Sequence, residues 1–299
     1  MRMKSIPQTE VLRARKPSVN KRVGSGVRVT LGAFIATAFL LPILWMVSGS
    51  FKDSQSVTAI PPKLIPNPFH FSNYVDAVKY IAFGTYLRNS VIVTVFTIFA
   101  TLLVCIPSAY AFSILRWRGK SAAFSVVLFG MMLPFPAVMI PMYLLFKKMG
   151  MIGNLSPLLV PPLVGQFVTP AFSSALAIFL LRQFLSQLPY ELVEAAKIDG
   201  AGSLRILVQI LLPLAKPVLT TITIMTALSS WTAFVGPLIF INSDSLSTLS
   251  LGLQQYQSQH FTAYNLLLAA STLYVLPVLI LFLVGQKYFT AGATRGAVK

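Results

Sequence analysis

The sequence predicts an all-α integral membrane protein with six transmembrane helices. Two observations support this prediction. The chain of 299 residues is 56% hydrophobic and only 10% charged, with a mean hydropathy of +0.76, a composition typical of membrane proteins. Apolar blocks of roughly 20 residues, the length that crosses a bilayer core as a helix, recur between short polar turns. The single cysteine, Cys105, excludes an intrachain disulfide.

The net charge of +17 could indicate a nucleic-acid partner, but the positions of the charges argue against one. Eight of the 24 Lys and Arg residues lie within residues 1–28, and most of the others lie in short loops. A basic segment beside a bilayer is attracted to anionic lipid. We therefore expect residues 1–28 to be a basic cytoplasmic tail next to a lipid bilayer, with no nucleic acid bound.

The first transmembrane helix is predicted over residues 29–50. Its apolar run from Val29 to Val47 is too long for the hydrophobic part of a signal peptide, and no obvious small-residue cleavage site follows it. Residues 51–87 contain four prolines and are predicted to form a structured extracytoplasmic loop.

Five more spans are predicted by the same length criterion. Prolines interrupt the fourth of the six, so we expect a kink there, because membrane helices tolerate proline where neighbours satisfy the freed carbonyl groups. The five predicted ranges are 89–114, 121–146, 157–181, 217–241 and 264–286.

The distribution of basic residues predicts how these spans are oriented. With the N-terminus inside, only six of the 24 Lys and Arg residues fall in outer loops. We therefore expect both termini in the cytoplasm, including a C-terminal tail over residues 287–299, together with the loop around Glu194. The six outer residues are Lys52, Lys63, Lys79, Arg88, Lys147 and Lys148.

One loop differs from the rest of the chain. Residues 189–213 hold three of the seven acidic residues, Glu191, Glu194 and Asp199. Pro189 suits the first turn of a helix, and the two glutamates suit the positive end of its dipole. The loop is therefore predicted to begin with a short helix outside the hydrocarbon.

The rest of this loop completes a helix–turn–helix. Gly200 and Gly202 can reverse the chain at little steric cost. On the residues alone, an ordinary interfacial helix is as good an interpretation as a docking element. The first helix would carry a small apolar face of Leu192, Ala195 and Ala196, and the second a face of Leu204, Leu207, Val208 and Leu211.

The spacing in this loop resembles the EAA motif, EAA-x3-G-x9-I-x-L-P, through Glu194-Ala195-Ala196, Gly200 and Ile210-Leu211-Leu212-Pro213. That motif marks the membrane subunits of ABC importers served by a separate substrate-binding protein. The resemblance implies a type I ABC importer permease fold with a core over residues 86–286 and a cytoplasmic coupling helix that docks on an ATPase. It assigns ATPase coupling to Glu191, Glu194, Ala195, Ala196, Asp199 and Gly200.

The same resemblance implies the partners and the compartment. A homologous second permease, two ATPase subunits and an extracytoplasmic sugar-binding protein would complete the importer in a prokaryotic inner membrane. ATP and magnesium would bind to the ATPase subunits, so no cofactor is expected in this chain. The expected mechanism is alternating access, in which closure of the ATPases moves the 189–213 element as a rigid lever.

Segments across nearly the whole chain beyond the tail resemble the sugar-importing branch of these permeases. The comparison is with the second membrane subunit of maltose- and glycerol-phosphate-type systems. Thr232, Thr290, Ala293 and Arg295 depart from the usual residues, which leaves the sugar undefined. The matching segments are AYAFSILRWRGK (109–120), LP…IPMYLLF (133–146), FLLRQFL (179–185) and QKYFTAGATRGAVK (286–299).

No catalytic constellation is visible in the sequence. Gly119-Lys120-Ser121 lacks the earlier glycine of a phosphate-binding loop, and His70 and His260 have no partners at metal-ligand spacing. We therefore expect a transport subunit rather than an enzyme, with no catalytic, cofactor-binding or metal-binding residues.

The predicted spans contain no acidic residue, which disfavours a proton or ion pathway and favours an uncharged hydroxylated solute. An ABC permease for a non-sugar solute and a self-sufficient secondary transporter remain as alternatives, with a membrane-embedded enzyme the weakest. No substrate-binding residue is assigned, because small and polar residues in membrane helices more often serve helix packing. Residues that could line a pathway are Gln166, Ser229, Ser230, Trp231, Thr232, Asn242 and Tyr274.

Overall fold

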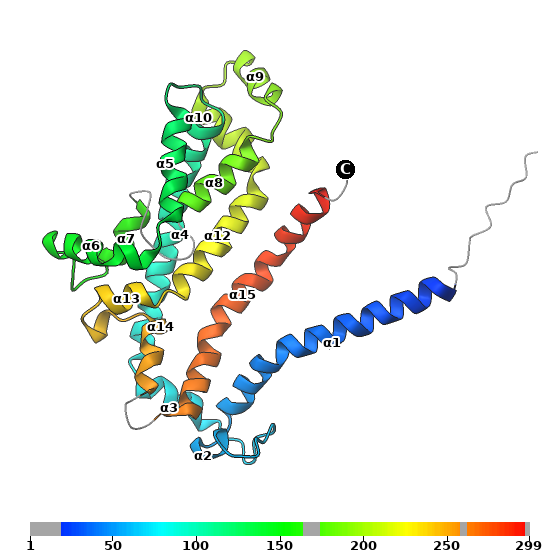
Figure 1. The fold of residues 1–299 in the computed structure, drawn as a ribbon, viewed down its shortest axis with the longest axis vertical. Helices are drawn as coiled ribbons and strands as arrows, with labels where there is room; N and C mark the ends of the chain where they lie inside the picture. The colour runs from blue at the N-terminus through cyan, green and yellow to red at the C-terminus, as the bar shows by residue number, and fades with distance from the viewer. Residues whose placement is uncertain (1–18, 164–173, 258–261, 297–299) are drawn as a thin grey trace, which may run out of the picture.

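The computed structural model describes residues 19–163, 174–257 and 262–296, with the backbone alone for 19–28 and 287–296. Within these ranges the chain is helical and contains no β-strand, which confirms the all-α prediction (Figure 1). The elements are α1 (Val19–Ser50), α2 (Ser54–Val57), α3 (Ser72–Tyr80), α4 (Phe83–Ser113), α5 (Lys120–Met132), α6 (Phe135–Lys148), α7 (Ser156–Leu163), α8 (Ser174–Leu185), α9 (Glu191–Ile198), α10 (Ser203–Arg205), the π-helix η1 (Ile206–Leu211), α11 (Leu212–Leu214), α12 (Lys216–Trp231), α13 (Val235–Phe240), the 3₁₀ turns η2 (Asp244–Leu246) and η3 (Leu253–Tyr256) on either side of α14 (Leu249–Gly252), and α15 (Tyr264–Gly296).

Three described helices are long and apolar enough to cross a membrane unbroken. They are Val29–Ser50 within α1, Phe83–Ser113 and Tyr264–Gln286 within α15. They correspond to the predicted spans 29–50, 89–114 and 264–286, although α4 begins at Phe83. Two sharply bent helix pairs, α5 with α6 and Ser203–Leu214 with α12, bring the number of candidate spans to as many as five, so the six predicted spans are matched in part.

The predicted span 121–146 is two helices rather than one. α5 ends at Met132, and α6 leaves it at 99°. A residue before proline is disfavoured in the helical region, and Leu133, which precedes Pro134, is extended with φ −73° and ψ 119°. Proline chemistry that hydropathy does not register therefore breaks this span.

The predicted span 217–241 is interrupted in a similar way. α12 ends at Trp231, and a separate short helix, α13, begins at Val235. Pro237 has no N–H with which to bond the carbonyl of Ala233. The Ser250 hydroxyl donates to that carbonyl instead, at 2.6 Å. A side chain from the following loop thus satisfies the group that the break exposes.

The fourth predicted span, 157–181, is described only at its ends. α7 contains Pro161 and Pro162, and α8 is an apolar helix of 12 residues. Residues 164–173, where part of the predicted kink falls, lie outside the described residues.

α4 is the central helix of the molecule. It packs against α8 and α12, while α15 packs against α12 and, near its start, against α1 and α3 (Figure 1). One buried cluster joins the last turns of α4 to α8, α9 and η1. A second joins the beginning of α4 to α3, α14 and α15. The bundle therefore has two separately packed ends.

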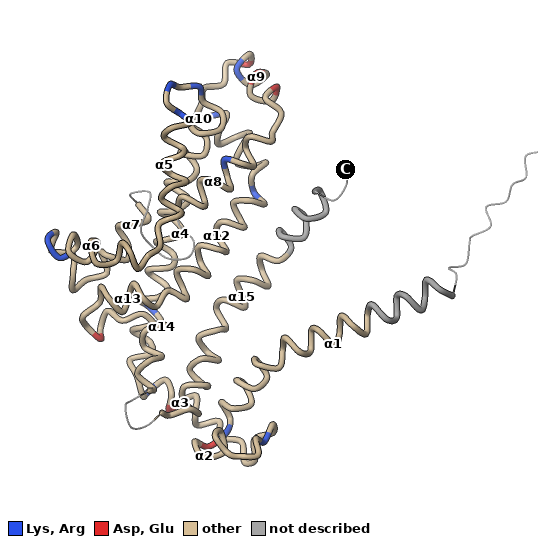
Figure 2. Tube along the Cα trace, viewed as in Figure 1, with Lys and Arg blue, Asp and Glu red and all other residues tan. Residues whose placement is uncertain are grey.

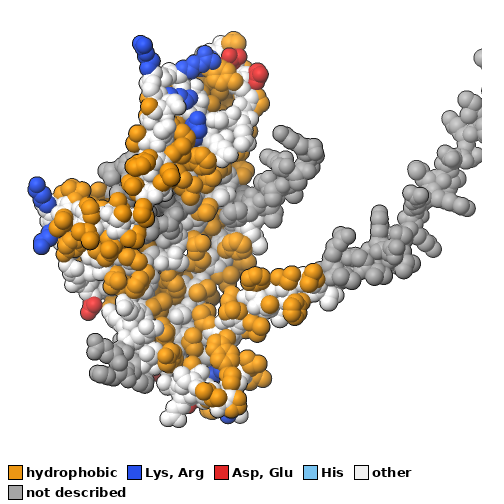
Figure 3. Space-filling view, viewed as in Figure 1, with side chains coloured by type: hydrophobic (Ala, Val, Ile, Leu, Met, Phe, Trp, Pro, Cys, Tyr) orange, Lys and Arg blue, Asp and Glu red, His pale blue; other side chains and the backbone are white. Residues whose placement is uncertain are grey.

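Charged side chains gather at the extremities. Figure 2 shows Lys and Arg around α9 and α10 and at the tip of α6, with only tan residues along most of α4, α12 and α15. In the space-filling view, hydrophobic side chains cover much of the face between these regions (Figure 3). This is the arrangement expected of a chain whose middle lies in hydrocarbon.

Candidate functional site

The short helix α9 lies at one end of the bundle, beyond the ends of α5, α8 and α12 (Figure 1). Its C-terminus is closed by two reversed hydrogen bonds, from Ala201 N–H to the Ala196 carbonyl at 2.9 Å and from Gly200 N–H to the Lys197 carbonyl at 3.0 Å. This is a Schellman cap, whose turn residue adopts a left-handed conformation. Gly200 has φ +76°, so the glycine makes the predicted turn.

α9 rests on the bundle through Val193 and Ala196, which are buried in one cluster with Leu185 and Leu211. Leu192 and Ala195 face outward instead. The predicted apolar face of Leu192, Ala195 and Ala196 is therefore split. The buried face of α9 contains Val193 rather than Leu192. Tyr190, three residues before Val193, packs against the same cluster and so lies on this face.

The six residues proposed for coupling divide between the surface and the core. Ala196 is only 7% exposed. In the described part of the chain, no hydrogen bond or ion pair engages the three carboxylates, so they are free to meet a partner. The exposed residues are Glu191, Glu194, Ala195, Asp199 and Gly200.

Two exposed apolar residues were not predicted as part of this surface. Ile198 is 86% exposed and Leu204 is 73% exposed, on either side of the Gly200 turn. The sequence could have indicated these two residues, because both are large and apolar and lie in a loop outside the predicted spans. Large exposed apolar side chains with a polar rim are a feature of protein-docking surfaces, and the carboxylates would belong to that rim.

The second segment of the loop departs from α-helical geometry. Residues Ile206–Leu211 form a π-helix, in which residues five apart lie on one face. Ile206 and Leu211 are buried, whereas Leu204 and Val208 are exposed. The predicted face of Leu204, Leu207, Val208 and Leu211 was wrong at those two exposed positions, because it assumed an α-helical period.

Basic and aromatic side chains secure the end of α4 beneath this loop. The last carbonyls of a helix have no partners within the helix. Arg182 Nε donates to the Phe112 carbonyl and Lys120 Nζ to the Ser113 carbonyl, both at 2.9 Å, and Trp117 Nε1 donates to Ala111 at 3.1 Å. The Arg182 guanidinium also lies 3.9 Å from the centre of the Phe124 ring. The platform under α9 is therefore tied together by side chains from three segments.

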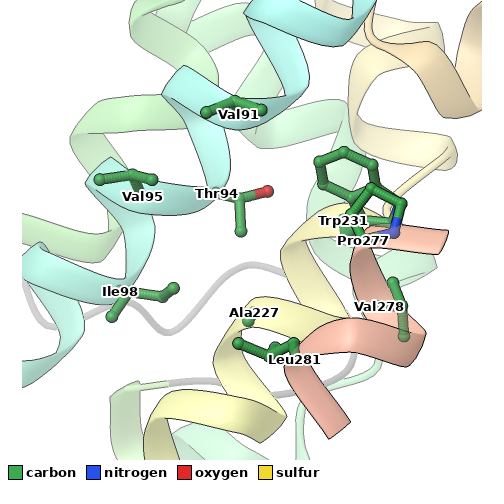
Figure 4. A pocket seen from close by; sticks show the side chains of 9 residues that line it. All are labelled: Val91, Thr94, Val95, Ile98, Ala227, Trp231, Pro277, Val278 and Leu281. Atoms are coloured by element: carbon green, nitrogen blue, oxygen red, sulfur yellow. The ribbon is translucent and has the colours of Figure 1, made fainter. Parts of the chain in front are cut away.

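A cavity of about 200 Å³ opens between α4, α12 and α15 (Figure 4). Its lining is apolar apart from Thr94, whose buried hydroxyl has no hydrogen-bond partner. In Figure 4 the Thr94 side chain points from α4 toward the space between the helices. The lining residues are Val91, Thr94, Val95, Ile98, Ala227, Trp231, Pro277, Val278 and Leu281.

The residues considered for a pathway are distributed over several environments. Trp231 borders this cavity, but its indole N–H donates to the Tyr274 carbonyl and the Tyr274 hydroxyl donates to the Trp231 carbonyl, at 3.1 and 3.0 Å. The two rings stack, so this pair joins α12 to α15. Asn242 lines a different, polar pocket, and Thr232 is exposed. Ser229 and Ser230 are half-buried, and Gln166 lies outside the described residues.

The fold and the α9 element define a membrane transport component, and comparison with known proteins gives its family. Residues 103–295 match the model of the family described as binding-protein-dependent transport system inner membrane component. The match covers more than half of the chain, and the chain belongs to this family.

Two relatives are similar over almost their whole length. The arabinooligosaccharides transport system permease protein AraQ of Halalkalibacterium halodurans is 31% identical over 91% of this chain and 95% of its own. The melibiose/raffinose/stachyose import permease protein MelC of Bacillus subtilis is 30% identical over 90% and 95%. A crystal structure of a bacterial ABC transporter involved in the import of the acidic polysaccharide alginate matches with a TM-score of 0.77 at 27% identity, over 92% of this chain and all of the matched chain.

Proposed function

We propose that the chain is a permease subunit of an ATP-driven ABC importer that translocates a sugar delivered by a substrate-binding protein. Relatives similar over nearly the full length carry names that refer to arabino-oligosaccharides and to melibiose, raffinose and stachyose. The three unbroken candidate spans contain no acidic residue, which suits an uncharged solute. The observation that carries the proposal is the exposed face of α9, which presents free carboxylates beside large apolar side chains.

In this proposal the chain crosses the membrane six times, with both termini and α9 in the cytoplasm. The three unbroken spans, the bent pair α5 and α6, α7 with α8, and α12 with α13 supply the six crossings. The basic residues near α9, including Arg116, Lys120 and Arg205, would lie on the cytoplasmic side. Lys147 and Lys148, at the end of α6 remote from α9, would lie outside.

The coupling surface is proposed to dock in an ATPase subunit. Glu191, Glu194 and Asp199 would meet basic or backbone N–H groups of that partner, and Ala195 would allow its backbone to come close. Ala196 lies on the opposite side of α9, where its methyl group packs against the bundle. Its proposed role in coupling is therefore to hold α9 in place rather than to contact the ATPase. A movement of the ATPase would thereby be transmitted to α8 and α12.

The full assembly is proposed to contain this chain, a homologous second permease, two ATPase subunits and an extracytoplasmic binding protein. ATP and magnesium would bind to the ATPases, with no cofactor in this chain. Alternating access would follow from movement of α9 with the packed cluster beneath it. The chain itself would carry out no hydrolysis.

Co-purification combined with transport tests this proposal. The chain is extracted from its native membrane in mild detergent, and co-purifying proteins are identified by mass spectrometry. We expect a second permease and an ATPase, together with uptake of a neutral oligosaccharide in proteoliposomes that requires ATP and the binding protein. Recovery of the chain alone, with uptake independent of ATP, would refute the proposal.

A further inference from the structure

A polar pocket of about 400 Å³ lies between α13 and η3, on the side of the molecule away from α9. Among the described residues, its polar groups are amides, hydroxyls and one carboxylate, and none of the lining residues in this part of the chain is Lys, Arg or His. The lining residues are Leu238, Ile241, Asn242, Ser243, Asp244, Ser247, Leu251, Gln254, Gln255 and Gln257.

Two neighbouring residues of α4 hold the wall of this pocket in place. Asn89 is 1% exposed, and its amide donates to the carbonyls of Ser245 and Ser247 at 2.9 and 3.0 Å. The hydroxyl of the adjacent Ser90 accepts from the Leu249 N–H at 2.7 Å. A polar loop is ordinarily mobile, but these buried bonds fix residues 245–249 to a long helix, which is the support that a preorganised binding site needs.

The opposite wall is fixed by Tyr86. Its hydroxyl accepts from the Gln255 side-chain amide at 3.0 Å. The ring reaches this position across Gly252, where an added Cβ would lie 2.4 Å from a Tyr86 ring carbon. The glycine therefore permits the close contact that orients Gln255 beside Asp244.

We propose that this pocket is an outer subsite for a neutral carbohydrate, an inference that rests on the importer function proposed above. Each sugar hydroxyl both donates and accepts, so it pairs with a lining of carbonyl oxygens, amide N–H groups and hydroxyls. The volume falls in the range of small-molecule sites, about 300–1,000 Å³. Asp244 carries the one charged side chain among the described lining residues, and its carboxylate repels acidic sugars and accepts hydrogen bonds from neutral ones.

Protection of an introduced cysteine tests the subsite. The native Cys105 is fully buried, so a charged maleimide reports on a single new thiol in this chain at Gln254→Cys, read on this chain after the subunits are separated. The matched control is Gln55→Cys, an exposed position in α2 remote from the pocket. The complete importer in nanodiscs is labelled first without and then with its binding protein, in the presence of raffinose, arabinotriose, diacetylchitobiose or trigalacturonate. ATP-dependent uptake of the same sugars is measured in parallel with the binding protein present.

We expect the transported neutral sugar to slow labelling of Gln254→Cys about fivefold at a concentration near four times its Kd, with no change at Gln55→Cys. Asp244→Leu should abolish this protection, and Asp244→Asn should allow trigalacturonate to protect. Equal rates with and without the transported sugar would overturn the subsite, as would protection that appears only with the binding protein. Uptake without protection would refute the subsite while leaving the importer function intact, whereas loss of both would refute both.

Discussion

Both ends of this molecule have an apolar cluster, but the loops at the two ends are attached to the bundle by different chemistry. At the α9 end, buried aliphatic side chains such as Leu185, Val193 and Leu211 form the contact between the loop and the bundle. At the other end, the buried amides of Asn73 and Asn89 bond to loop carbonyls. The loops at this second end have backbone carbonyl groups outside any helix, and these groups need hydrogen-bond donors. The α9 loop thus has a packed aliphatic base, whereas the loops at the other end are held by buried polar clamps.

The largest effect is expected in the packed end. Leu185, the last residue of α8, is fully buried in the cluster that joins α8 to the α9 loop. Leu185→Ala should reduce the free energy of unfolding by about 2–5 kcal/mol, because it removes buried methyl groups and leaves a cavity. Thermal unfolding of the purified importer measures this loss.

The matched surface variant is Ile198→Ala, which removes an equally large side chain from an exposed position. It should leave the unfolding temperature unchanged but reduce the amount of ATPase that co-purifies. If both variants destabilise the protein equally, then Ile198 is not a free docking side chain.

Asn89→Leu should produce a somewhat smaller loss at the other end. The substitution keeps the number and branching of the side-chain heavy atoms but leaves the carbonyls of Ser245 and Ser247 without their buried donor. An unsatisfied buried group costs about 1–3 kcal/mol. Hydrogen exchange should increase across residues 243–249 and remain unchanged across α9. Exchange that increases at both ends would show that they are not separately stabilised.

The difference between the ends also explains what the sequence could predict. The α9 loop was predictable because its acidic residues, its glycine and its proline spacing are local features of the chain. The breaks at Leu133 and Thr232 were not predicted, because a hydropathy average does not register the backbone restrictions that proline imposes. It also contains no information on the long-range hydrogen bond from Ser250 to the Ala233 carbonyl. The clamp made by Asn89 joins residues 156 positions apart, a pairing that no local pattern indicates. The predicted faces failed at α9 and η1, because tertiary packing and a π-turn shifted the helical register.

Gly200→Val tests whether the turn after α9 positions the docking surface. A β-branched residue is strained at φ +76°, at a cost of about 1–2 kcal/mol. A penalty near 1.4 kcal/mol lowers the population of the docked geometry about tenfold. Transport and ATPase coupling should fall accordingly, while the amount of protein in the membrane stays the same. Gly200→Asn is the control, since Asn tolerates this conformation better and should retain more activity.

The smallest expected effect concerns pH and the short helix α2. A hydrogen bond from the Ser56 side chain, assisted by the Ser56 N–H at 3.1 Å, holds the pKa of Asp53 below its ordinary value of 3.8. Because the folded-state pKa is the lower one, the stabilisation is complete above pH 3.8 and is lost as the pH falls through the folded-state value. Asp53→Ala should therefore speed hydrogen exchange of residues 54–57 at neutral pH, and this difference from the unmodified chain should shrink in acid. A difference that persists undiminished at pH 2 would mean that the charge of Asp53 does not support the cap.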